Sequence, residues 1–392
     1  MSFPLRGRAA IAGIGQTEFS KESGRSELRL ACEAAKAALD DAGLSPRDVD
    51  GLVTFTMDSS EEAEVARNLG IPRLTLFSRI PYGGGGACAV VHQAAMAVAT
   101  GAAEVVVCWR AFNERSGMRF GGAAMSGATM LPPFLDMVGP FGLLTPASWV
   151  ALQARRYMHE YGVTNEHFGR ISVVDRRHAA NNPAAWFHGR PITMEDHQAS
   201  RWIVEPLHLL DCCLVTDGGG AIVVTSTERA RDLRRGAARL AGFGQVHSSE
   251  IVHPDRHEAG IGGGREAGEQ AYRMAGLGPT DVDVVQIYDG FTPLVVHSLL
   301  VYGFCRADEV GAFVAAGNLE FDRGRLPANT AGGLLSEGHL SGFNHVVEAV
   351  RQLRGTSTSQ VPDVEVSMVT GYGGAPHEAP PTVAYTVAIL TR

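Results

Sequence analysis

The 392-residue chain is poor in charge. Asp, Glu, Lys and Arg make up only 19% of it, whereas 45% is apolar, and soluble domains usually carry roughly a quarter of charged residues. With so few charged residues, much of the protein surface is expected to be covered by partner subunits, so we expect an oligomer. The formal net charge is −8 and no basic cluster stands out, so nucleic-acid binding is not expected.

Long apolar runs, targeting signals and paired cysteines are also absent. No stretch approaches the roughly 20 apolar residues of a membrane-spanning helix, and residues 1–8 lack the apolar core of a signal peptide. The six cysteines show no CxxC spacing, which argues against a disulfide framework and against a metal site. We therefore expect a protein of the reducing cytoplasm with mostly buried thiols and no membrane span.

What the chain does contain is an internal repeat. Residues 42–50 (AGLSPRDVD) return as residues 275–283 (AGLGPTDVD), with seven of nine positions identical. Each copy follows an Ala-rich amphipathic stretch and precedes an apolar run, a pattern typical of helix, tight turn and strand. The predicted helices span 28–42 and 266–275, and the predicted strands span 51–55 and 284–288.

Both copies continue in the same way, with a glycine-rich loop, a helix and a buried strand. In the first half these are residues 83–86, about 88–99 and 104–109, and in the second half 338–342, about 344–353 and 364–369. The repeat therefore predicts an internal duplication with two equivalent glycine loops. A site can form between the halves where such loops meet.

The duplication divides the chain into residues 1–230 and 231–392. Within the first half, residues from about 112 to 200 differ in composition, because they are rich in Met, Pro, Gly, Arg and His. They include a predicted polar helix over 146–161. We interpret them as an inserted cap that covers the core and shapes a pocket for a bulky ligand. A dimerisation lobe is the alternative.

Four blocks carry a family resemblance: residues 211–219 (DCCLVTDGG), 286–292 (QIYDGFT), 329–333 (NTAGG) and 338–339 (GH). In this order the chain resembles the thiolase superfamily, and within it the sterol-carrier-protein thiolases, also called lipid-transfer proteins. The resemblance covers essentially the whole chain. It implies an α/β thiolase fold, in which two βαβαβ-type halves form a five-layer αβαβα core, with coenzyme A thioester substrates and a homodimer.

The first departure from that family concerns the nucleophile. Thiolases carry a reactive cysteine in the loop before the first-half helix, and alignment places this position at Gly84 or its neighbour. Without a thiol there, no acyl-enzyme forms. Cys88 lies about one helical turn downstream. We expect it to be a small packed helix residue, and the alternative is a nucleophile displaced by one turn.

Two further family positions hold a phenol. The block that helps to build the oxyanion hole, commonly His-Asp-Cys-Phe in sterol-carrier thiolases, begins here with Tyr288, and Tyr372 replaces the acid/base cysteine of the C-terminal loop. A tyrosine hydroxyl can donate to a developing enolate oxygen. The alternatives are a core residue for Tyr288 and a lid residue for Tyr372.

Two histidines follow the second glycine loop. His339 matches the histidine of the family's Gly-His-Pro motif, which binds the thioester oxygen in thiolases, although Leu340 replaces the proline. His345, at the start of the next predicted helix, is a weaker candidate that could only cap or pack. The resemblance thus implies a site that has exchanged thiols for phenols and imidazoles.

Such a site suits a retro-aldol cleavage, which needs a stabilised enolate and a base but no covalent intermediate. Residues 338–355 resemble the steroid side-chain aldolases, a cysteine-less branch that cleaves a β-hydroxyacyl-CoA into a ketosteroid and propionyl-CoA. We expect Tyr372 or His345 to be the base, and Tyr288 with His339 to donate to the thioester oxygen.

The same resemblance implies a small partner protein with a zinc ribbon and an oligonucleotide-binding-type barrel. We expect no cofactor in this chain, because the substrate itself carries coenzyme A and any zinc would belong to the partner. Two other functions stay open: a non-catalytic sterol- or acyl-CoA-binding or lipid-transfer protein, and a thiolase or acetyl-CoA acetyltransferase that uses Cys88 or another thiol.

Overall fold

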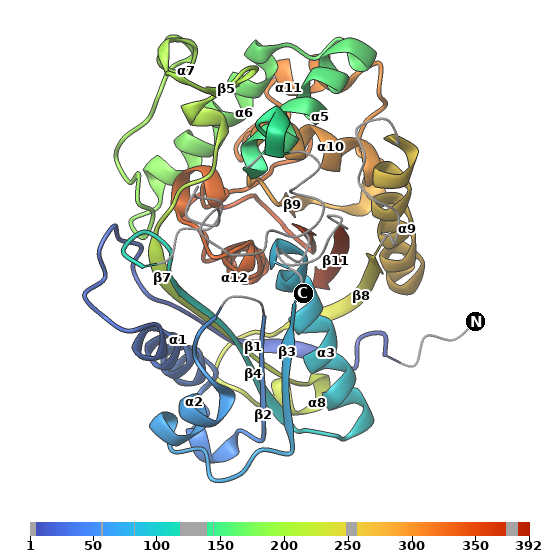
Figure 1. Cartoon of the computed structure of the whole chain (residues 1–392). Helices are drawn as coiled ribbons and strands as arrows, with labels where there is room; N and C mark the ends of the chain where they lie inside the picture. Colours follow the sequence, from blue (N-terminus) through green and yellow to red (C-terminus); the bar gives the residue numbers. More distant parts are fainter. Residues whose placement is uncertain are drawn as a thin grey trace.

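The computed structural model describes residues 5–55, 58–81, 83–117, 139–143, 145–247, 257–373 and 383–392. Strands form a large mixed sheet and a short hairpin, with helices on both sides (Figure 1). The strands are β1 (Ala9–Gln16), β2 (Gly51–Phe55), β3 (Leu76–Ile80), β4 (Val105–Asn113), β5 (Trp202–Val204), β6 (Leu207–His208), β7 (Asp217–Ser226), β8 (Ala238–His247), β9 (Val284–Gln286), β10 (Val366–Gly373) and β11 (Ala384–Thr391). The helices are α1 (Glu27–Ala42), α2 (Glu62–Leu69), α3 (Gly86–Thr100), α5 (Pro146–Tyr161), α6 (Asn165–Asn181), α7 (Met194–Ala199), α8 (Thr227–Ala230), α9 (His257–Ala275), α10 (Thr292–Val301), α11 (Val310–Ala315) and α12 (Phe343–Arg354).

The sheet topology is duplicated. Its strand order is β3-β2-β4-β7-β1-β8-β11-β10-β9. In the first half β2 and β4 are parallel, and β4–β7 and β7–β1 are antiparallel. In the second half β9 and β10 are parallel, and β10–β11 and β11–β8 are antiparallel. A short antiparallel contact between β1 and β8 joins the two ladders.

The repeated segment makes the same turn in both halves. The helix ends at a left-handed glycine, Gly43 (φ 76°) or Gly276 (φ 69°). A short 3₁₀ turn follows, in which an aspartate accepts a hydrogen bond from the backbone N–H three residues upstream, 2.8 Å for Asp48 and 2.7 Å for Asp281. The repeated Gly and Asp positions are thus explained by the turn they build.

The last aspartate of the repeat connects this turn to the parallel strand that lies beside β2 or β9 in the sheet. Asp50 accepts a hydrogen bond of 2.9 Å from the N–H of Val105 at the start of β4. Asp283 accepts one of 2.9 Å from the N–H of Val366 at the start of β10. The same residue therefore sets the register of equivalent strands in the two halves.

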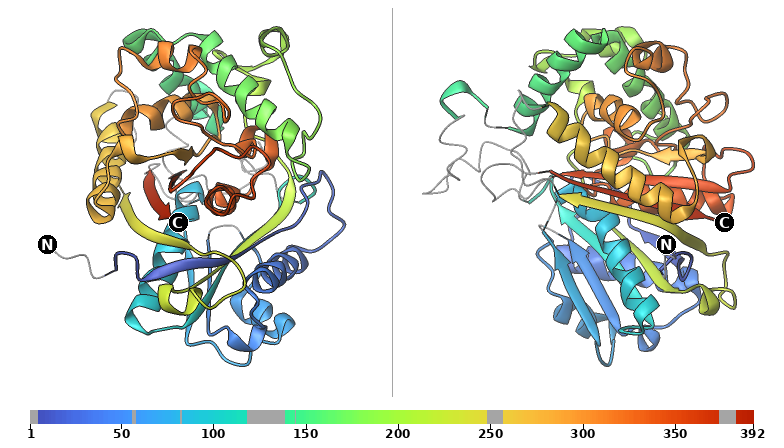
Figure 2. Two further views of the ribbon diagram at one scale, coloured as in Figure 1. Left: turned by 180° about the vertical axis from the view of Figure 1, so that it is seen from behind. Right: turned by 90° about the vertical axis from the view of Figure 1, so that its right-hand side faces the viewer.

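The helices and strands form five layers. One apolar cluster contains residues from α3, α12 and strands of both halves, among them Val90, Val347, Ile222 and Leu390. A second cluster lies between α1 and the outer side of the first-half strands, and a third joins α9 and α10 to the second-half strands. The predicted αβαβα fold is confirmed, and Figure 2 shows the second half (orange and red) stacked on the first (blue).

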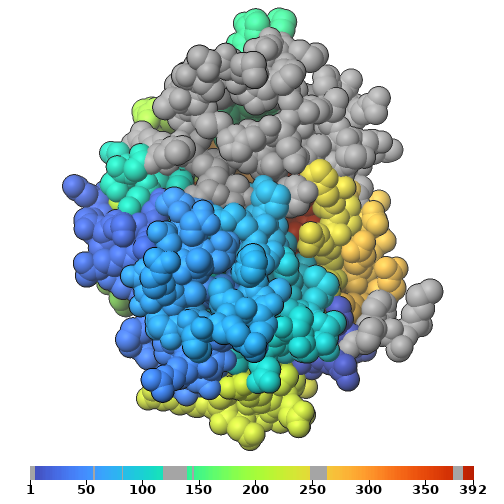
Figure 3. Space-filling view, turned by 60° about the horizontal axis from the view of Figure 1, so that its bottom comes forward, coloured from blue at the N-terminus to red at the C-terminus, as the bar shows by residue number. Residues whose placement is uncertain are grey.

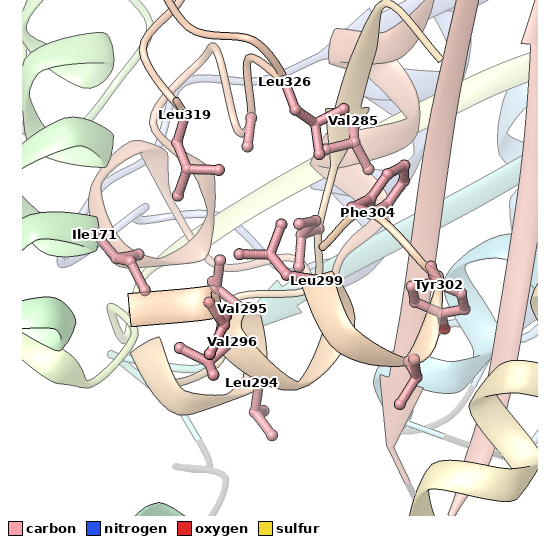
Figure 4. Packing of buried hydrophobic residues seen from close by; sticks show 14 of the residues in the cluster. Ile171, Val285, Leu294, Val295, Val296, Leu299, Tyr302, Phe304, Leu319 and Leu326 are labelled. Atoms are coloured by element: carbon pink, nitrogen blue, oxygen red, sulfur yellow. The ribbon is translucent and has the colours of Figure 1, made fainter. Parts of the chain in front are cut away.

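The described part of the expected cap packs on the second half. Apolar residues of α5 and α6 join the cluster around α10, where Ile171 lies beside Val295 and Val296 (Figure 4). Helix α5 covers Pro146–Tyr161, as predicted. Strand β4 ends at Asn113, close to the expected start of the cap at about residue 112. Residues 118–138 and 144 lie outside the described part.

Several predicted ends shift by a few residues. Helix α9 begins at His257 rather than 266, while β9 ends at Gln286 rather than 288. At Tyr288 the backbone N–H donates to the Thr370 hydroxyl (3.1 Å) instead of continuing the ladder. Within the described ranges, no helix combines the length and apolarity that crossing a membrane requires.

Candidate active site

The glycine loops of the two halves meet at the side chain of Tyr288. A Cβ atom added to Gly84 would lie 2.2 Å from Cε2 of Tyr288 and 2.5 Å from the carbonyl oxygen of Tyr372. Atoms of this kind cannot approach so closely, so the Tyr288 ring occupies the space that a side chain at position 84 would need. The predicted nucleophile position is therefore filled from the other half of the chain.

Three glycines surround the Tyr288 ring. A Cβ atom on Gly290 or Gly342 would lie 3.0 Å from a ring carbon. Gly342 also has φ 87°, a left-handed conformation that favours glycine. These positions lack side chains because the phenol needs the room, and they hold its ring between the two halves.

Tyr372 lies next to Tyr288, with 6.3 Å between the ring centroids. Burial raises the pKa of Tyr372 to about 12. Burial, followed by the nearby Cys213 and Glu114, raises the pKa of Tyr288 well above its usual value. Both phenols therefore stay protonated at neutral pH and present O–H donors.

His339 forms a buried pair with Glu114, the residue that follows β4. Its Nδ1 lies 2.6 Å from Oε2 of Glu114, and its backbone N–H donates to the Thr216 hydroxyl at 2.8 Å. His339 is 7% exposed and Glu114 is 3% exposed. When Nδ1–H donates to the carboxylate, Nε2 carries the lone pair and can accept a proton.

Glu114 was missed in the sequence, because it falls in the stretch assigned to the cap. The available signal is its position directly after a buried apolar strand, where acidic residues at strand ends often belong to sites. Its effect on the pKa of Tyr288 places it close to the phenol as well as to His339. The two halves thus contribute Glu114 and His339 to one pair.

His345 is buried differently, against Asp289. Its Nε2 lies 2.9 Å from Oδ1 of Asp289, and the two side chains are 2% and 0% exposed. Asp289 also accepts hydrogen bonds from the N–H groups of Leu334 (2.8 Å) and Leu335 (3.1 Å). This arrangement holds α12 against the segment after β9, and it suits a positioning role for His345.

The cap contributes a second pair behind Tyr372. The Tyr157 hydroxyl of α5 lies 2.6 Å from Nδ1 of His297 on α10. The His297 ring packs edge-on against Tyr372, with 5.7 Å between centroids. Neither residue was identified from the sequence, because both follow the ordinary apolar spacing of their helices.

The thiols are poorly suited to nucleophilic attack. Cys88 is completely buried in α3, its Sγ donates to the Val369 carbonyl (3.6 Å), and burial raises its pKa to about 12. Burial also raises the pKa of Cys213, which is half-buried near Tyr288. A reactive thiol needs the opposite shift. Only Cys88 and Cys108 of the six are fully buried, so the expectation of mostly buried thiols is too strong.

Among the described residues, neither a cluster of metal ligands nor either of two surface cavities marks the candidate site. The described residues hold no group of three or more His, Cys, Asp or Glu side chains arranged for a metal ion. Two surface cavities of about 310 and 270 Å³ are lined by residues near Arg229 and near Arg177. Neither includes Tyr288, Tyr372 or His339, so the polar cluster rather than either cavity identifies the candidate site.

Comparison with sequence models of protein families matches residues 9–228 to "Thiolase, N-terminal domain" and residues 244–385 to "Thiolase C-terminal domain-like". Among curated relatives, the chain is 57% identical to a steroid side-chain-cleaving aldolase of Thermomonospora curvata over 387 residues, covering 95% of this chain and 97% of the relative. It is 54% identical to the 17-hydroxy-3-oxo-4-pregnene-20-carboxyl-CoA lyase of Mycobacterium tuberculosis over 383 residues, covering 95% and 98%.

A solved structure agrees with these relatives. The chain is similar to a chain of the "Ltp2-ChsH2(DUF35) aldolase", with a TM-score of 0.90 and 56% sequence identity, covering 99% of each chain. The similarity therefore extends over the whole fold, including the elements that carry Tyr288, His339 and Tyr372.

Proposed function

The chain belongs to the thiolase family, and we propose that it is a carbon–carbon lyase that cleaves a β-hydroxyacyl-CoA by a retro-aldol reaction. The acyl group is a steroid side chain, and the products are a ketosteroid and a short acyl-CoA such as propionyl-CoA. Two relatives more than half identical over nearly their whole length, one named an aldolase and one a CoA lyase, support this substrate class.

The observation that carries the proposal is the Tyr288 ring in the space beside Gly84. A thiolase needs a nucleophile at this point to form an acyl-enzyme. A phenol there leaves no room for one, but it can donate a hydrogen bond to an oxygen that gains negative charge. The site has therefore lost covalent catalysis and kept enolate stabilisation.

His339 was expected to donate to the thioester oxygen, but its Nδ1 lies on the Glu114 carboxylate, so we propose instead that it is the proton acceptor, oriented by Glu114. Nε2 takes the proton of the substrate β-hydroxyl, the hydroxyl oxygen becomes the ketone, and the bond between the α- and β-carbons breaks. The electron pair of that bond passes into the thioester enolate. Return of the proton to the α-carbon releases the short acyl-CoA, so the reaction balances without a cofactor.

The two phenols stabilise the enolate oxygen in this scheme. Tyr372 was expected as a base, but a phenol with its pKa raised to about 12 is a better donor than proton acceptor at neutral pH. His345, the other expected base, has its Nε2 on Asp289. We therefore assign Tyr288 and Tyr372 as donors and His345 as a positioning residue.

The direct test uses purified protein and a steroid β-hydroxyacyl-CoA, with mass spectrometry of both products. Release of a ketosteroid and propionyl-CoA in equal amounts is expected. Tyr288→Phe and Tyr372→Phe should each lower the rate about a hundredfold, the usual loss for one oxyanion donor. Thiolysis of acetoacetyl-CoA by free CoA, or substrate binding without cleavage, would instead support a thiolase or a lipid-transfer protein.

The assembly is part of the proposal. The relative in the solved structure is named as an Ltp2-ChsH2(DUF35) aldolase, and we infer a small partner of that kind, with a zinc ribbon and an oligonucleotide-binding-type barrel. The reaction should therefore be measured with and without it. The six unpaired cysteines are compatible with the reducing cytoplasm.

We also infer a homodimer. Strand β3 is the last strand on its side of the sheet, and Phe77 in this strand is 70% exposed. An open strand edge with an exposed aromatic residue is a pairing surface. It belongs to the first half, whose outer surface is seen in blue in Figure 3. Light scattering of Phe77→Glu against the native protein tests this assembly.

A further inference from the structure

Arg110 of β4 is a buried guanidinium without hydrogen-bond acceptors for two of its nitrogens. The residue is 1% exposed, and among the described residues neither Nε nor Nη1 has a hydrogen-bond partner. Two aromatic rings enclose it, with the guanidinium carbon 5.3 Å from the Phe55 centroid and 4.7 Å from the Phe112 centroid. Burying such a group is costly, and an unsatisfied one in a native fold calls for an explanation.

Carboxylates surround this cation. Burial lowers the pKa of Arg110, and the charges of Asp58, Glu27 and Glu114 act in the opposite direction, while Arg79 repels it. Asp58 is itself 3% exposed and is held by the backbone N–H groups of Ala111 and Ser60, both at 2.8 Å. Arg110 therefore balances negative charge from three elements.

The strand geometry directs Arg110 toward the candidate site. Residues 110, 112 and 114 lie on one side of β4 and its continuation, because side chains alternate along a strand. On the neighbouring strand β7, Gly220 is opposite Arg110. A Cβ atom on Gly220 would lie 3.1 Å from Cδ1 of Leu340. Arg110 and Glu114 thus share the sheet face on which the His339 loop packs.

We propose that Arg110 is a positioning residue whose charge keeps the Glu114–His339 pair as carboxylate and neutral imidazole. Without this cation, the negative charges of Glu27 and Asp58 near the pair would be uncompensated, which favours the imidazolium. The protonated imidazole has no lone pair at Nε2 and cannot take the substrate proton. This inference rests on the proposed function.

The main experiment is the pH profile of kcat/KM for cleavage. In Arg110→Met the acid limb should move to higher pH by about one unit or more, as expected when an opposite charge within a few ångströms is lost. Arg110→Lys keeps the charge and should return the limb toward its native position. Asp58→Asn removes a carboxylate that competes for Arg110, and should move the limb to lower pH.

The charges facing the pair define the controls. Tyr288 of the second half and Cys213 of the segment before β7 face Glu114, and Asp289 lies near both of them. All three are unchanged in these variants. Arg354→Met is a matched control, because Arg354 is also buried (7% side-chain exposure) but pairs with Asp41 far from His339. It should lower stability and leave the acid limb in place.

The outcomes separate charge from structure. An unmoved acid limb in Arg110→Met, or an equal movement in Arg110→Lys, overturns the inference. If Arg110→Met does not fold, Asp58→Asn provides the test. An acid limb that stays in place or moves to higher pH in this variant overturns the inference. Should the native protein cleave no β-hydroxyacyl-CoA, the proposed function fails. The inference is then tested by NMR titration of the His339 imidazole in the same variants, assigned with His339→Gln.

Discussion

The two glycine loops occupy equivalent places in the duplicated fold but contribute different things. The first, at Gly83–Gly85, provides empty space, which the Tyr288 ring fills. The second, between Gly338 and Gly342, provides His339 and leads into α12 with His345. The duplication therefore fixes where a site can form, while the chemistry is distributed unevenly between the halves.

The helices behind these loops differ in the same way. Both α3 and α12 lie in the central layer, and the buried residues of α3 are almost all small or apolar. Helix α12 buries His345, Glu348 and Gln352 instead. Glu348 accepts hydrogen bonds from the hydroxyls of Thr330 (2.7 Å) and Ser357 (2.6 Å). A polar network thus holds α12, the helix that follows the loop with the functional side chains, against residues 330 and 357.

The largest expected effect is on the second loop. His339→Ala removes the assigned base, and cleavage should fall about a hundredfold to ten-thousandfold, the usual contribution of general base catalysis. Glu114→Gln should cause a smaller loss, because the imidazole remains. Steady-state kinetics with the steroid thioester measures both. A His339→Ala enzyme with native kcat would contradict the division of roles between the two loops.

A substitution in the first loop should act only by displacing the Tyr288 ring sterically. Gly84→Ala places a methyl group 2.2 Å from the Tyr288 ring, so the phenol must move, and we expect a rate loss approaching that of Tyr288→Phe. Gly236→Ala is the matched control, since a Cβ atom there meets nothing within 4 Å. Equal kinetics of the two alanine variants would mean that the Tyr288 ring does not need the space beside Gly84.

The polar support of the second loop predicts a pH-dependent stability. Burial raises the pKa of Glu337, the residue before Gly338, from 4.5 to about 6. The folded protein therefore binds this proton more tightly than the unfolded chain. Its contribution to the free energy of unfolding is present below pH 4.5 and is lost as the pH rises through about 6, by at most about 2 kcal/mol.

Urea unfolding at several pH values measures this contribution. Glu337→Gln should flatten the fall between pH 4.5 and 6, whereas Glu365→Gln, at an exposed position, should leave it unchanged. A native slope in Glu337→Gln would show that another group titrates there.

The smallest expected effect is at Cys88. Since its thiol is buried in an apolar cluster and its pKa is raised to about 12, Cys88→Ala should keep cleavage within a fewfold of native. Iodoacetamide should also leave the native rate unchanged. Loss of activity in both experiments would restore the thiolase mechanism and remove the contrast between the loops.

Local patterns in the sequence predicted most of the fold. The ends of β2 and α5 match the prediction, because a run of apolar residues bounded by turn residues specifies a strand or helix locally. The repeat predicted two equivalent halves, and in each half its last aspartate, Asp50 or Asp283, binds the start of an equivalent strand, β4 or β10. The resemblance to a known family brought Tyr288, His339, His345 and Tyr372 together as candidates, and their roles stay a proposal.

The tertiary structure decided how these residues meet. Glu114 and His339 lie 225 positions apart in the chain, and no local pattern marks them as a pair. The same is true of Tyr157 with His297, and of the Tyr288 ring beside Gly84. Sequence periodicity records which side of an element is buried, whereas contacts between elements depend on how the layers pack. The chain by itself therefore determined its halves and their loops, and only the packing of one half on the other decided which loop provides space and which provides chemistry.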